Sequence, residues 1–255
     1  MKFKSLIVFT IILSCLSLTA YAKDKDVIAV WMLEEGKGDL VKDTTGNGHE
    51  GKIIGAKWVE GKFGKALQFN GTSDFIEVPH DDTLSLQTYT IIATFKIPAA
   101  PTGWYTIICK DTAGPIRTYG LFVGTNGLLN CSFSTGNQWR GIYDINVDPD
   151  LDTRVDDGKW HTVAIAYDMK TYRVYIDDKL EAQKKITDKP DAADMTVTIG
   201  SWHGGGWING LIDEIYLSER ALSEAEIQKF SSGIATASPV YTKNKLAVTW
   251  GHIKL

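Results

Sequence analysis

Aromatic side chains gather in stretches of this 255-residue chain that the pattern predicts to be loops. Rings in loops can stack on the apolar C–H faces of sugars, while nearby polar side chains hydrogen-bond the hydroxyl groups. The candidate ligand-binding residues are Trp104, Trp139, Arg140, Tyr143, Trp202 and Trp207. The three glycines at 204–206 predict a mobile, exposed platform between the last two tryptophans. The alternative is that these rings cap the ends of a hydrophobic core.

One carboxylate stands in an unusual place. The stretch from Asn209 to Leu217 has the pattern of a strand, and successive strand side chains point to opposite faces. Asp213 therefore shares a face with Leu211, Ile215 and Leu217. Such a carboxylate has to be exposed, paired or bound to a cation, because burying an unpaired charge is costly. The sequence predicts that Asp213 belongs to a structural metal site, with pairing to a lysine as the alternative.

The residues do not form a pattern typical of catalysis. Retaining glycosidases need two carboxylates about 5–5.5 Å apart, whereas Asp213 and Glu214 are adjacent and face opposite ways on a strand. His161 lies inside an apolar strand, which favours a core histidine with satisfied hydrogen bonds. The sequence has no phosphate-binding loop and no motif around a serine or cysteine nucleophile. We therefore expect no enzyme, with a polysaccharide hydrolase as the alternative.

Short strands must position these residues. Alternating apolar residues, separated by turn signals such as Asn70-Gly71, predict about a dozen strands between 27 and 217. A single helix is expected at about 224–231, because Ser223 and Glu226 form a capping box and Gly233 ends it. The pattern predicts an all-β fold, an antiparallel two-sheet jelly-roll sandwich with one short C-terminal helix.

The first 22 residues have the features of a signal peptide. Lys2 and Lys4 precede an apolar run that is too short for a comfortable membrane span, and the chain has no second long apolar run. Cleavage is expected near Ala22, and the mature protein is expected to be secreted or to be periplasmic or extracellular. The alternative is a lipoprotein modified at Cys15. The predicted domain covers 23–233, and 234–255 is a tail or an extra edge strand. We expect no transmembrane anchor.

The charge and the cysteine content indicate which partners to expect and whether a disulfide forms. Removing Lys2 and Lys4 leaves 25 basic and 31 acidic residues, and no basic block stands out, so nucleic acid is not expected as a partner. Cys109 and Cys131 remain after cleavage. The pattern places strand 119–124 between their strands, and strands two apart are separated by about 10 Å, which is too far for a disulfide. Two buried thiols are therefore favoured, with a disulfide as the alternative.

Several stretches, taken together, resemble a known family. They are Trp31, Asp43-x-x-Gly-Asn47-Gly-x-x-Gly51, Gly64-Lys-Ala-Leu-x-Phe-Asn-Gly71, Trp160-His161-x-Val-Ala, Val174-Tyr-Ile-Asp177, Gly210-Leu-Ile-Asp213-Glu-Ile and Arg220-Ala-Leu-Ser-x-x-Glu-Ile227. Together these stretches resemble the laminin-G-like, concanavalin-A-like jelly-roll domains over about 27–230. One departure is Asp177-Asp178, where the family usually has Asp-Gly. The resemblance implies two sheets of six or seven strands.

The resemblance also implies a calcium ion that ties the early glycine-rich loop to the late strand. Calcium takes six to eight oxygen ligands from carboxylates, amides, backbone carbonyls and water. The candidate ligands are Asp43, Asn47, the backbone carbonyl of His49, and Asp213. In the alternative, Asp43 and Asn47 are turn residues that hydrogen-bond their own backbone.

These expectations combine into one function. The chain is predicted to be an exported, non-catalytic module that binds carbohydrate or a surface glycoconjugate and is stabilised by calcium. The alternative is an adhesion or structural module whose tryptophans contact a protein partner.

Overall fold

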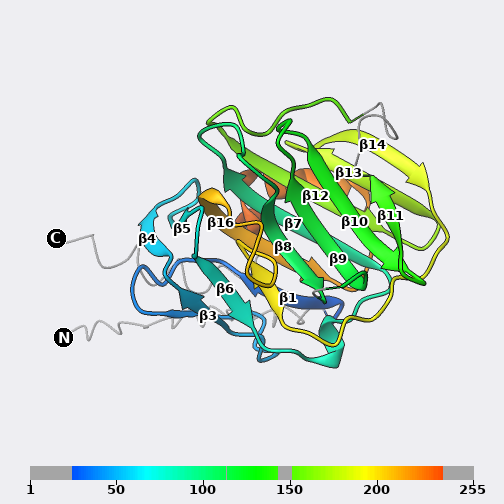
Figure 1. Cartoon of the computed structure of the whole chain (residues 1–255), viewed down its shortest axis with the longest axis horizontal. Helices are drawn as coiled ribbons and strands as arrows, with labels where there is room; N and C mark the ends of the chain where they lie inside the picture. Colours follow the sequence, from blue (N-terminus) through cyan, green and yellow to red (C-terminus); the bar gives the residue numbers. More distant parts are fainter. Residues whose placement is uncertain (1–24, 113, 143–150, 238–255) are drawn as a thin grey trace, which may run out of the picture.

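The computed structural model describes residues 25–112, 114–142 and 151–237 as two packed antiparallel sheets (Figure 1). One sheet, sheet A, has the order β14-β13-β12-β7-β16-β5-β4 with β1 paired to β16; the other, sheet B, has the order β11-β10-β9-β8-β15-β6-β3-β2. The strands are β1 Val27–Trp31, β2 Leu40–Val41, β3 Gly51–Ile54, β4 Lys57–Glu60, β5 Lys65–Asn70, β6 Phe75–Val78, β7 Tyr89–Lys96, β8 Tyr105–Asp111, β9 Arg117–Val123, β10 Leu129–Thr135, β11 Gln138–Ile142, β12 Trp160–Tyr167, β13 Thr171–Ile176, β14 Lys179–Lys185, β15 Val197–Ile199 and β16 Asn209–Ser218. The predicted sandwich is confirmed, with eight strands in each sheet instead of six or seven.

The main core lies between the two sheets and is rich in rings. Phe133 from sheet B stacks against Tyr167 and Tyr172 from sheet A at centroid distances of 5.0 and 6.0 Å. Tyr89 contacts Tyr119 at 5.8 Å across the same layer. Along strands such as β7, β10 and β13 the inward residues alternate with outward ones, so the predicted faces of these strands supply this core.

The central strand of sheet A breaks that alternation once. In β16, Ile212 joins Ile215 and Leu217 in the main core, and the register between β16 and β7 shifts between Ile212 and Ile215. The shift is a bulge that leaves one extra residue in β16. The expectation that Asp213 shares a face with Ile215 and Leu217 is therefore wrong, because strict alternation does not run through this point.

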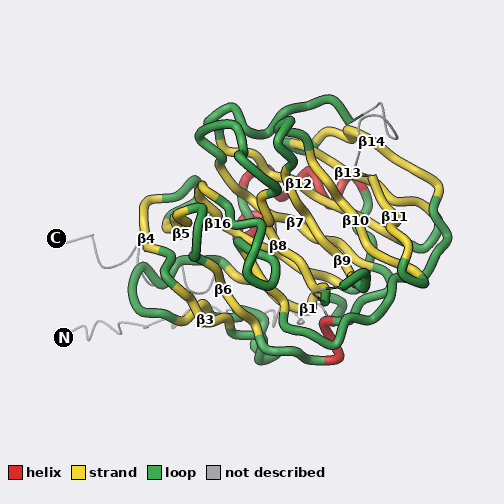
Figure 2. Tube along the Cα trace, in the orientation of Figure 1, coloured by secondary structure: helices red, strands yellow, loops and turns green. Residues whose placement is uncertain are grey.

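The C-terminal helix covers the outer face of sheet A. The capping box between Ser223 and Glu226 is present as predicted. The α-helix α1 spans Glu224–Ile227 and continues as the 3-10 helix η2, Gln228–Ser232, before Gly233. Phe230 packs on Tyr216 at 4.9 Å, which fixes the helix to β16. A second short helix, α2 at Ile234–Ala237, follows in the segment expected to begin the tail; Figure 2 shows how few helical residues the fold contains.

The two cysteines confirm the predicted strand order. β9 lies between β8, which carries Cys109, and β10, which carries Cys131. Both thiols are buried and reduced, and burial raises the pKa of each above its ordinary value. The alternative of a disulfide is wrong because a whole strand separates the two side chains.

In the hairpin between β13 and β14, Asp178 stands where the family usually has the glycine of Asp-Gly. Asp177 and Asp178 adopt φ angles of 49° and 68°, as a tight hairpin turn requires. Asp177 is held there, because its carboxylate accepts hydrogen bonds from Thr162 N at 2.9 Å and from His161 Nδ1 at 2.8 Å. His161 is buried with both ring nitrogens bonded, as the sequence predicted.

Three of the sequence predictions lie outside the described residues. They are the signal peptide at 1–22, the candidate ligand-binding residue Tyr143 and most of the C-terminal tail. Among the residues that the structure describes, none of the helices has the length and apolar content to cross a membrane.

Candidate functional site

The outward face of sheet B has a floor of small and polar residues. On β10 the inward Leu129, Cys131 and Phe133 alternate with Asn130 and Ser132, which face outward. Ser132 lies opposite Gly120 of β9 and Gly141 of β11. A Cβ on Gly120 would lie 2.2 Å from the Phe122 ring and 3.0 Å from the Arg117 side chain. Gly120 therefore lets Phe122 and Arg117 lie close against the sheet, where both border a hollow in this face.

Arg117 lies across that hollow in a fixed position. Its guanidinium stacks between the rings of Phe122 and Trp139, at 4.3 and 4.4 Å from their centroids. Its Nε and Nη2 both donate to Asp111 Oδ2, at 3.1 and 3.0 Å, and its Nη1 donates to Ser132 Oγ at 2.9 Å. A planar cation held by two rings and by two hydrogen bonds to one carboxylate oxygen has little freedom to move.

Asp111 is the acid at the base of this network. Burial raises the pKa of its carboxyl, and the positive charge of Arg117 opposes that rise. His203 Nε2 lies 3.1 Å from Asp111 Oδ1 and also contacts the Asp111 backbone carbonyl. The aspartate therefore fixes both Arg117 and the loop that carries His203.

That loop, 200–208, presents Trp202 to the hollow. Trp202 and Gly205 exchange backbone hydrogen bonds at 2.9 and 2.7 Å, and Gly206 O accepts from Thr106 N at 2.8 Å. The Trp202 ring meets Phe122 edge-on at 5.9 Å. The prediction of an exposed platform is wrong, because these contacts leave both Trp202 and Trp207 half-buried.

Three tryptophans surround the hollow and turn it into a cavity of about 390 Å³. Trp104 and Trp139 remain 44% and 40% exposed, which is unusual for side chains of this size. We name this the aromatic cavity; it is lined by Trp104, Asp111, Thr112, Gly114, Arg117, Phe122, Asn130, Ser132, Trp139 and Trp202. It combines apolar walls with a polar floor, as small-molecule sites do.

The structure brings together half of the predicted ligand-binding residues. Trp104, Trp139 and Trp202 line the aromatic cavity. Trp207 lines an adjoining cavity of about 230 Å³ that shares Trp104 and Trp202, and its ring packs on Phe75 at 5.7 Å. Arg140 lies beyond Trp139 and pairs with Asp188 at 3.0 Å. Tyr143 lies outside the described residues.

Sequence reasoning missed Arg117, Asp111 and Phe122. One signal was available, because Asn130 and Ser132 are polar residues on the outward face of a strand whose inward face is apolar. The pairing of Arg117 with Asp111 had no comparable signal. It depends on the β8–β9 register, in which Asp111 lies opposite Arg117 after an irregularity.

The early glycine-rich loop is organised around Asp43. Asp43 Oδ1 accepts from Val30 N at 3.2 Å and from Thr45 N at 3.0 Å, while Oδ2 accepts from Asn47 N and His49 N at 3.2 and 3.3 Å. The Asn47 amide donates to Ile28 O at 2.8 Å, and the His49 carbonyl accepts from Trp31 Nε1 at 2.6 Å. These are the backbone bonds of a turn residue, one of the two roles that the sequence left open.

Asp213 contacts a different segment. Its Oδ2 accepts from Lys62 N at 2.6 Å and Phe63 N at 2.9 Å, in the turn between β4 and β5. Glu214 accepts a hydrogen bond from Ile234 N at 2.7 Å, in a different segment. The two adjacent carboxylates therefore do not face a common ligand position. Asp213 therefore accepts from two backbone N–H groups of the β4–β5 turn.

The predicted calcium ligands therefore have hydrogen-bond donors around them. Within the described part of the chain, no group of three or more His, Cys, Asp and Glu side chains is arranged to hold a metal ion. Carboxylate oxygens carry further lone pairs, and backbone carbonyls and water also bind calcium. Calcium at Asp43 and Asp213 remains a prediction.

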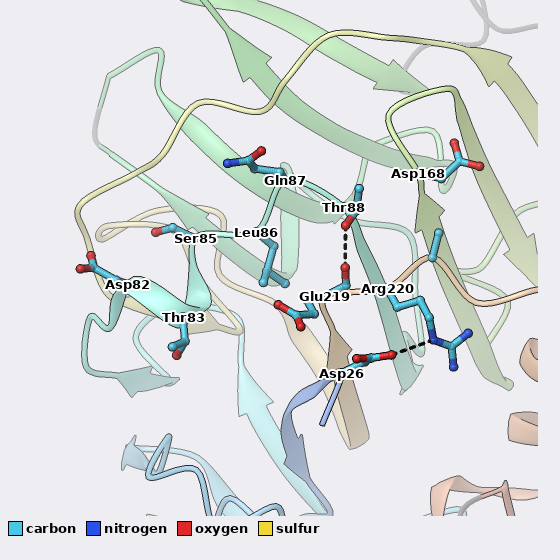
Figure 3. A pocket seen from close by; sticks show the side chains of 11 residues that line it. Asp26, Asp82, Thr83, Ser85, Leu86, Gln87, Thr88, Asp168, Glu219 and Arg220 are labelled. Atoms are coloured by element: carbon cyan, nitrogen blue, oxygen red, sulfur yellow. Dashed lines mark hydrogen bonds and ion pairs between the residues drawn. The ribbon is translucent and has the colours of Figure 1, made fainter. Parts of the chain in front are cut away.

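A larger cavity, of about 660 Å³, opens at another place on the molecule (Figure 3). We name it the polar cavity; it is lined by Asp26, Asp82, Thr83, Ser85, Leu86, Gln87, Thr88, Asp168, Glu219, Arg220 and Ala221. In Figure 3, Asp82 and Asp168 lie on opposite sides, and Arg220 turns to Asp26, 3.4 Å away. Its polar groups do not converge on one ligand position.

Comparisons with known proteins agree with this fold. Domain 4 of AbnA, an arabinanase of Geobacillus stearothermophilus solved with arabinotriose, has a TM-score of 0.63 and 21% identity, over 81% of this chain and 98% of that one. The binding domain of Paraclostridial mosquitocidal protein 1 gives 0.64 and 16%, over 81% of this chain and 52% of that one. Trypanosoma rangeli sialidase with sialic acid gives 0.60 and 15%, over 81% of this chain and 32% of that one. The chain thus spans about half of the mosquitocidal binding domain and a third of the sialidase.

The curated proteins contain no match to this sequence. The model of one protein family matches residues 70–228, which cover β6 to β16 and α1. The match includes the strands that build the aromatic cavity. The chain therefore belongs to the concanavalin A-like lectin/glucanases superfamily.

Proposed function

We propose that this protein is a non-catalytic carbohydrate-binding module and that the aromatic cavity is its binding site. The observation that carries the proposal is the pair of exposed rings, Trp104 and Trp139, on either side of a polar floor. The complex of the arabinanase domain with arabinotriose, a domain of the same fold and size, also supports it.

The floor offers hydrogen-bonding groups that suit hydroxyl groups. Arg117 has five N–H donors, and its bonds to Asp111 and Ser132 use three of them. Asn130 Oδ1 accepts from Ser132 Oγ at 2.8 Å, which orients that hydroxyl. A sugar ring stacked on a tryptophan would place its hydroxyls near this floor.

The cavity does not suit glycoside hydrolysis. A glycosidase needs two carboxylates on either side of the bond, and Asp111 is the single carboxylate among the described residues that line the cavity. Asp111 is also bound to Arg117 and His203. A fixed and paired carboxylate is a poor general acid, so binding without turnover is the better fit.

A glycan array followed by calorimetry tests the proposal. Trp139→Ala should abolish binding to the saccharide found by the array, because it removes a wall of the cavity. Leu40→Ala is the matched control, because Leu40 is 47% exposed on β2, at the opposite end of the same sheet. If no glycan on the array binds and a pull-down captures one specific protein, the result would instead favour an adhesion module that binds a protein partner.

We also propose that calcium stabilises this module and that it is exported. At a Kd of about 10 µM and about 1 mM free calcium, bound ion would stabilise the fold by roughly 2.7 kcal/mol. A chelator should then lower the Tm, and added calcium should restore it. An unchanged Tm with no calcium by elemental analysis would exclude the ion. N-terminal sequencing of the exported protein should begin near Lys23.

A further inference from the structure

Trp104 and Trp202 line the aromatic cavity and also a smaller cavity beside it. This adjoining cavity, of about 230 Å³, is lined by Thr102, Trp104, Tyr105, Trp202 and Trp207 together with three glycines. Small-molecule sites usually have volumes of about 300–1,000 Å³, so the adjoining cavity is small for a ligand of its own. Because the two cavities share two rings, they border each other, and one ligand can occupy both.

A row of side chains joins Trp139 to the rings that the two cavities share. Arg117 lies 4.4 Å from the Trp139 ring centroid and 4.3 Å from that of Phe122. Phe122 in turn meets Trp202 at 5.9 Å. The row starts on β11, passes β9 and ends in the loop after β15, and these strands lie in this order in sheet B. The two cavities therefore form a track that crosses the strands of sheet B.

Backbone hydrogen bonds hold the segments that form the adjoining cavity. Gly71 N donates to Ile208 O at 2.9 Å, which joins the β5–β6 turn to the loop after β15. Thr106 N donates to Gly206 O at 2.8 Å, which joins that loop to β8. A Cβ on Gly206 would lie 2.8 Å from the Trp202 ring, so glycine lets this ring lie against the backbone. The walls are thus formed before a ligand binds, which lowers the entropic cost of binding.

The charges that line the two cavities are balanced. Among its described lining residues, the adjoining cavity has no Asp, Glu, Lys, Arg or His. In the aromatic cavity the one lining carboxylate, Asp111, accepts two hydrogen bonds from the one lining cation, Arg117. His203 also contacts Asp111 but lines neither cavity. Hydroxyl groups of a ligand therefore find the remaining N–H donors of Arg117 and the hydroxyl of Thr102, whereas a charged group finds no uncompensated partner.

We propose that the two cavities form one extended site for a linear, uncharged oligosaccharide of at least two sugar units. One unit stacks beside Trp139 in the aromatic cavity, the chain passes over Trp104, and the next unit lies against Trp207. This inference rests on the proposed function of the aromatic cavity. It adds the class of the ligand, an uncharged chain instead of a single or an acidic sugar, and a second subsite at Trp207.

A chain-length series tests the inference by calorimetry. The probes are arabino-, xylo-, cello- and manno-oligosaccharides of one to five units. In at least one series the affinity should rise about tenfold between one and three units, which corresponds to about 1.4 kcal/mol, because the longer chain reaches the adjoining cavity. The affinity should be the same at low and high salt, since salt has no ligand charge to screen. A clear loss of affinity at high salt would overturn the uncharged class.

Two variants locate the gain with length. Trp207→Ala removes a wall of the adjoining cavity, and Thr102→Trp fills that cavity from an exposed position without removing a packed ring. Each should abolish the gain and leave the affinity for the shortest member that binds unchanged. Trp58→Ala is the matched control, because Trp58 is also half-buried but lies on β4, the terminal strand of sheet A.

The outcomes separate this inference from the proposed function. Equal affinity for short and long members of every series, with binding still lost in Trp139→Ala, would overturn the extended site and leave the carbohydrate module intact. A gain with length that survives both Trp207→Ala and Thr102→Trp would place the second unit elsewhere and also overturn the extended site. Binding in no series, or binding that Trp139→Ala does not weaken, would overturn both proposals.

Discussion

The polar cavity and the aromatic cavity differ in how their charges are held. In the polar cavity, Arg220 pairs with Asp26 and Glu226 while 40% of its side chain remains exposed. In the aromatic cavity, Arg117 is 13% exposed, lies between two rings and binds an aspartate that is 4% exposed. The polar cavity is the larger, but water screens its charges. Size alone is therefore no reason to place a ligand in the polar cavity; our proposal of the aromatic cavity rests on its fixed polar groups beside exposed rings.

The largest expected effect separates the two arginines. Arg117→Met should lower the free energy of unfolding by about 3 kcal/mol, because Asp111 would stay buried without its arginine and keep only His203 as a partner. Arg220→Met, the matched change in the polar cavity, should cost less than about 1 kcal/mol. Urea denaturation of both variants measures the difference, and Arg117→Met/Asp111→Leu should recover part of the loss. Equal costs would mean that the two ion pairs are equally screened.

The next effect concerns ligand affinity. Trp104→Ala should weaken saccharide binding by about 2 kcal/mol, roughly thirtyfold, because exposed rings in interfaces carry much of the binding energy. Gln87→Ala, an exposed change in the polar cavity, should leave the affinity unchanged. Calorimetry with one saccharide compares them directly. The opposite pattern would move the binding site to the polar cavity.

The smallest expected effect is a pH-dependent change in stability, which tests the exposed ion pair between Arg220 and Glu226. The hydrogen bond from Arg220 is the largest cause that lowers the pKa of the Glu226 carboxyl, and the hydrogen bonds from Ser223 lower it further. The pKa falls from 4.5 to about 2. A lowered folded pKa contributes stability above the unfolded pKa, and this stability is lost as the pH falls through the folded value. Glu226→Gln should thus cost about 1 kcal/mol at pH 7 and almost nothing near pH 2. Thermal melts of both proteins across this range measure it, and a cost independent of pH would show that charge has no part in it.

Much of the fold could be predicted because its signals are local. The apolar strand at 160–167, the alternating strand at 172–177, the capping box of Ser223 and the separation of Cys109 from Cys131 all appear in the structure. The site was predicted less completely. Trp104, Trp139 and Trp202 could be selected because aromatic residues stood in apparent loops, but the sequence could not tell that Trp207 and Arg140 lie in neighbouring cavities.

The sequence by itself determined the strands, the helix start, the reduced cysteines and the aromatic character of the site. Each depends on residue types within a few positions of one another or on the order of adjacent strands. Only the tertiary structure decided that Arg117 lies between Phe122 and Trp139, and that Asp43 and Asp213 accept hydrogen bonds from different backbone segments. Those contacts depend on strand register and on the bulge in β16, where a shift of one residue redirects every following side chain.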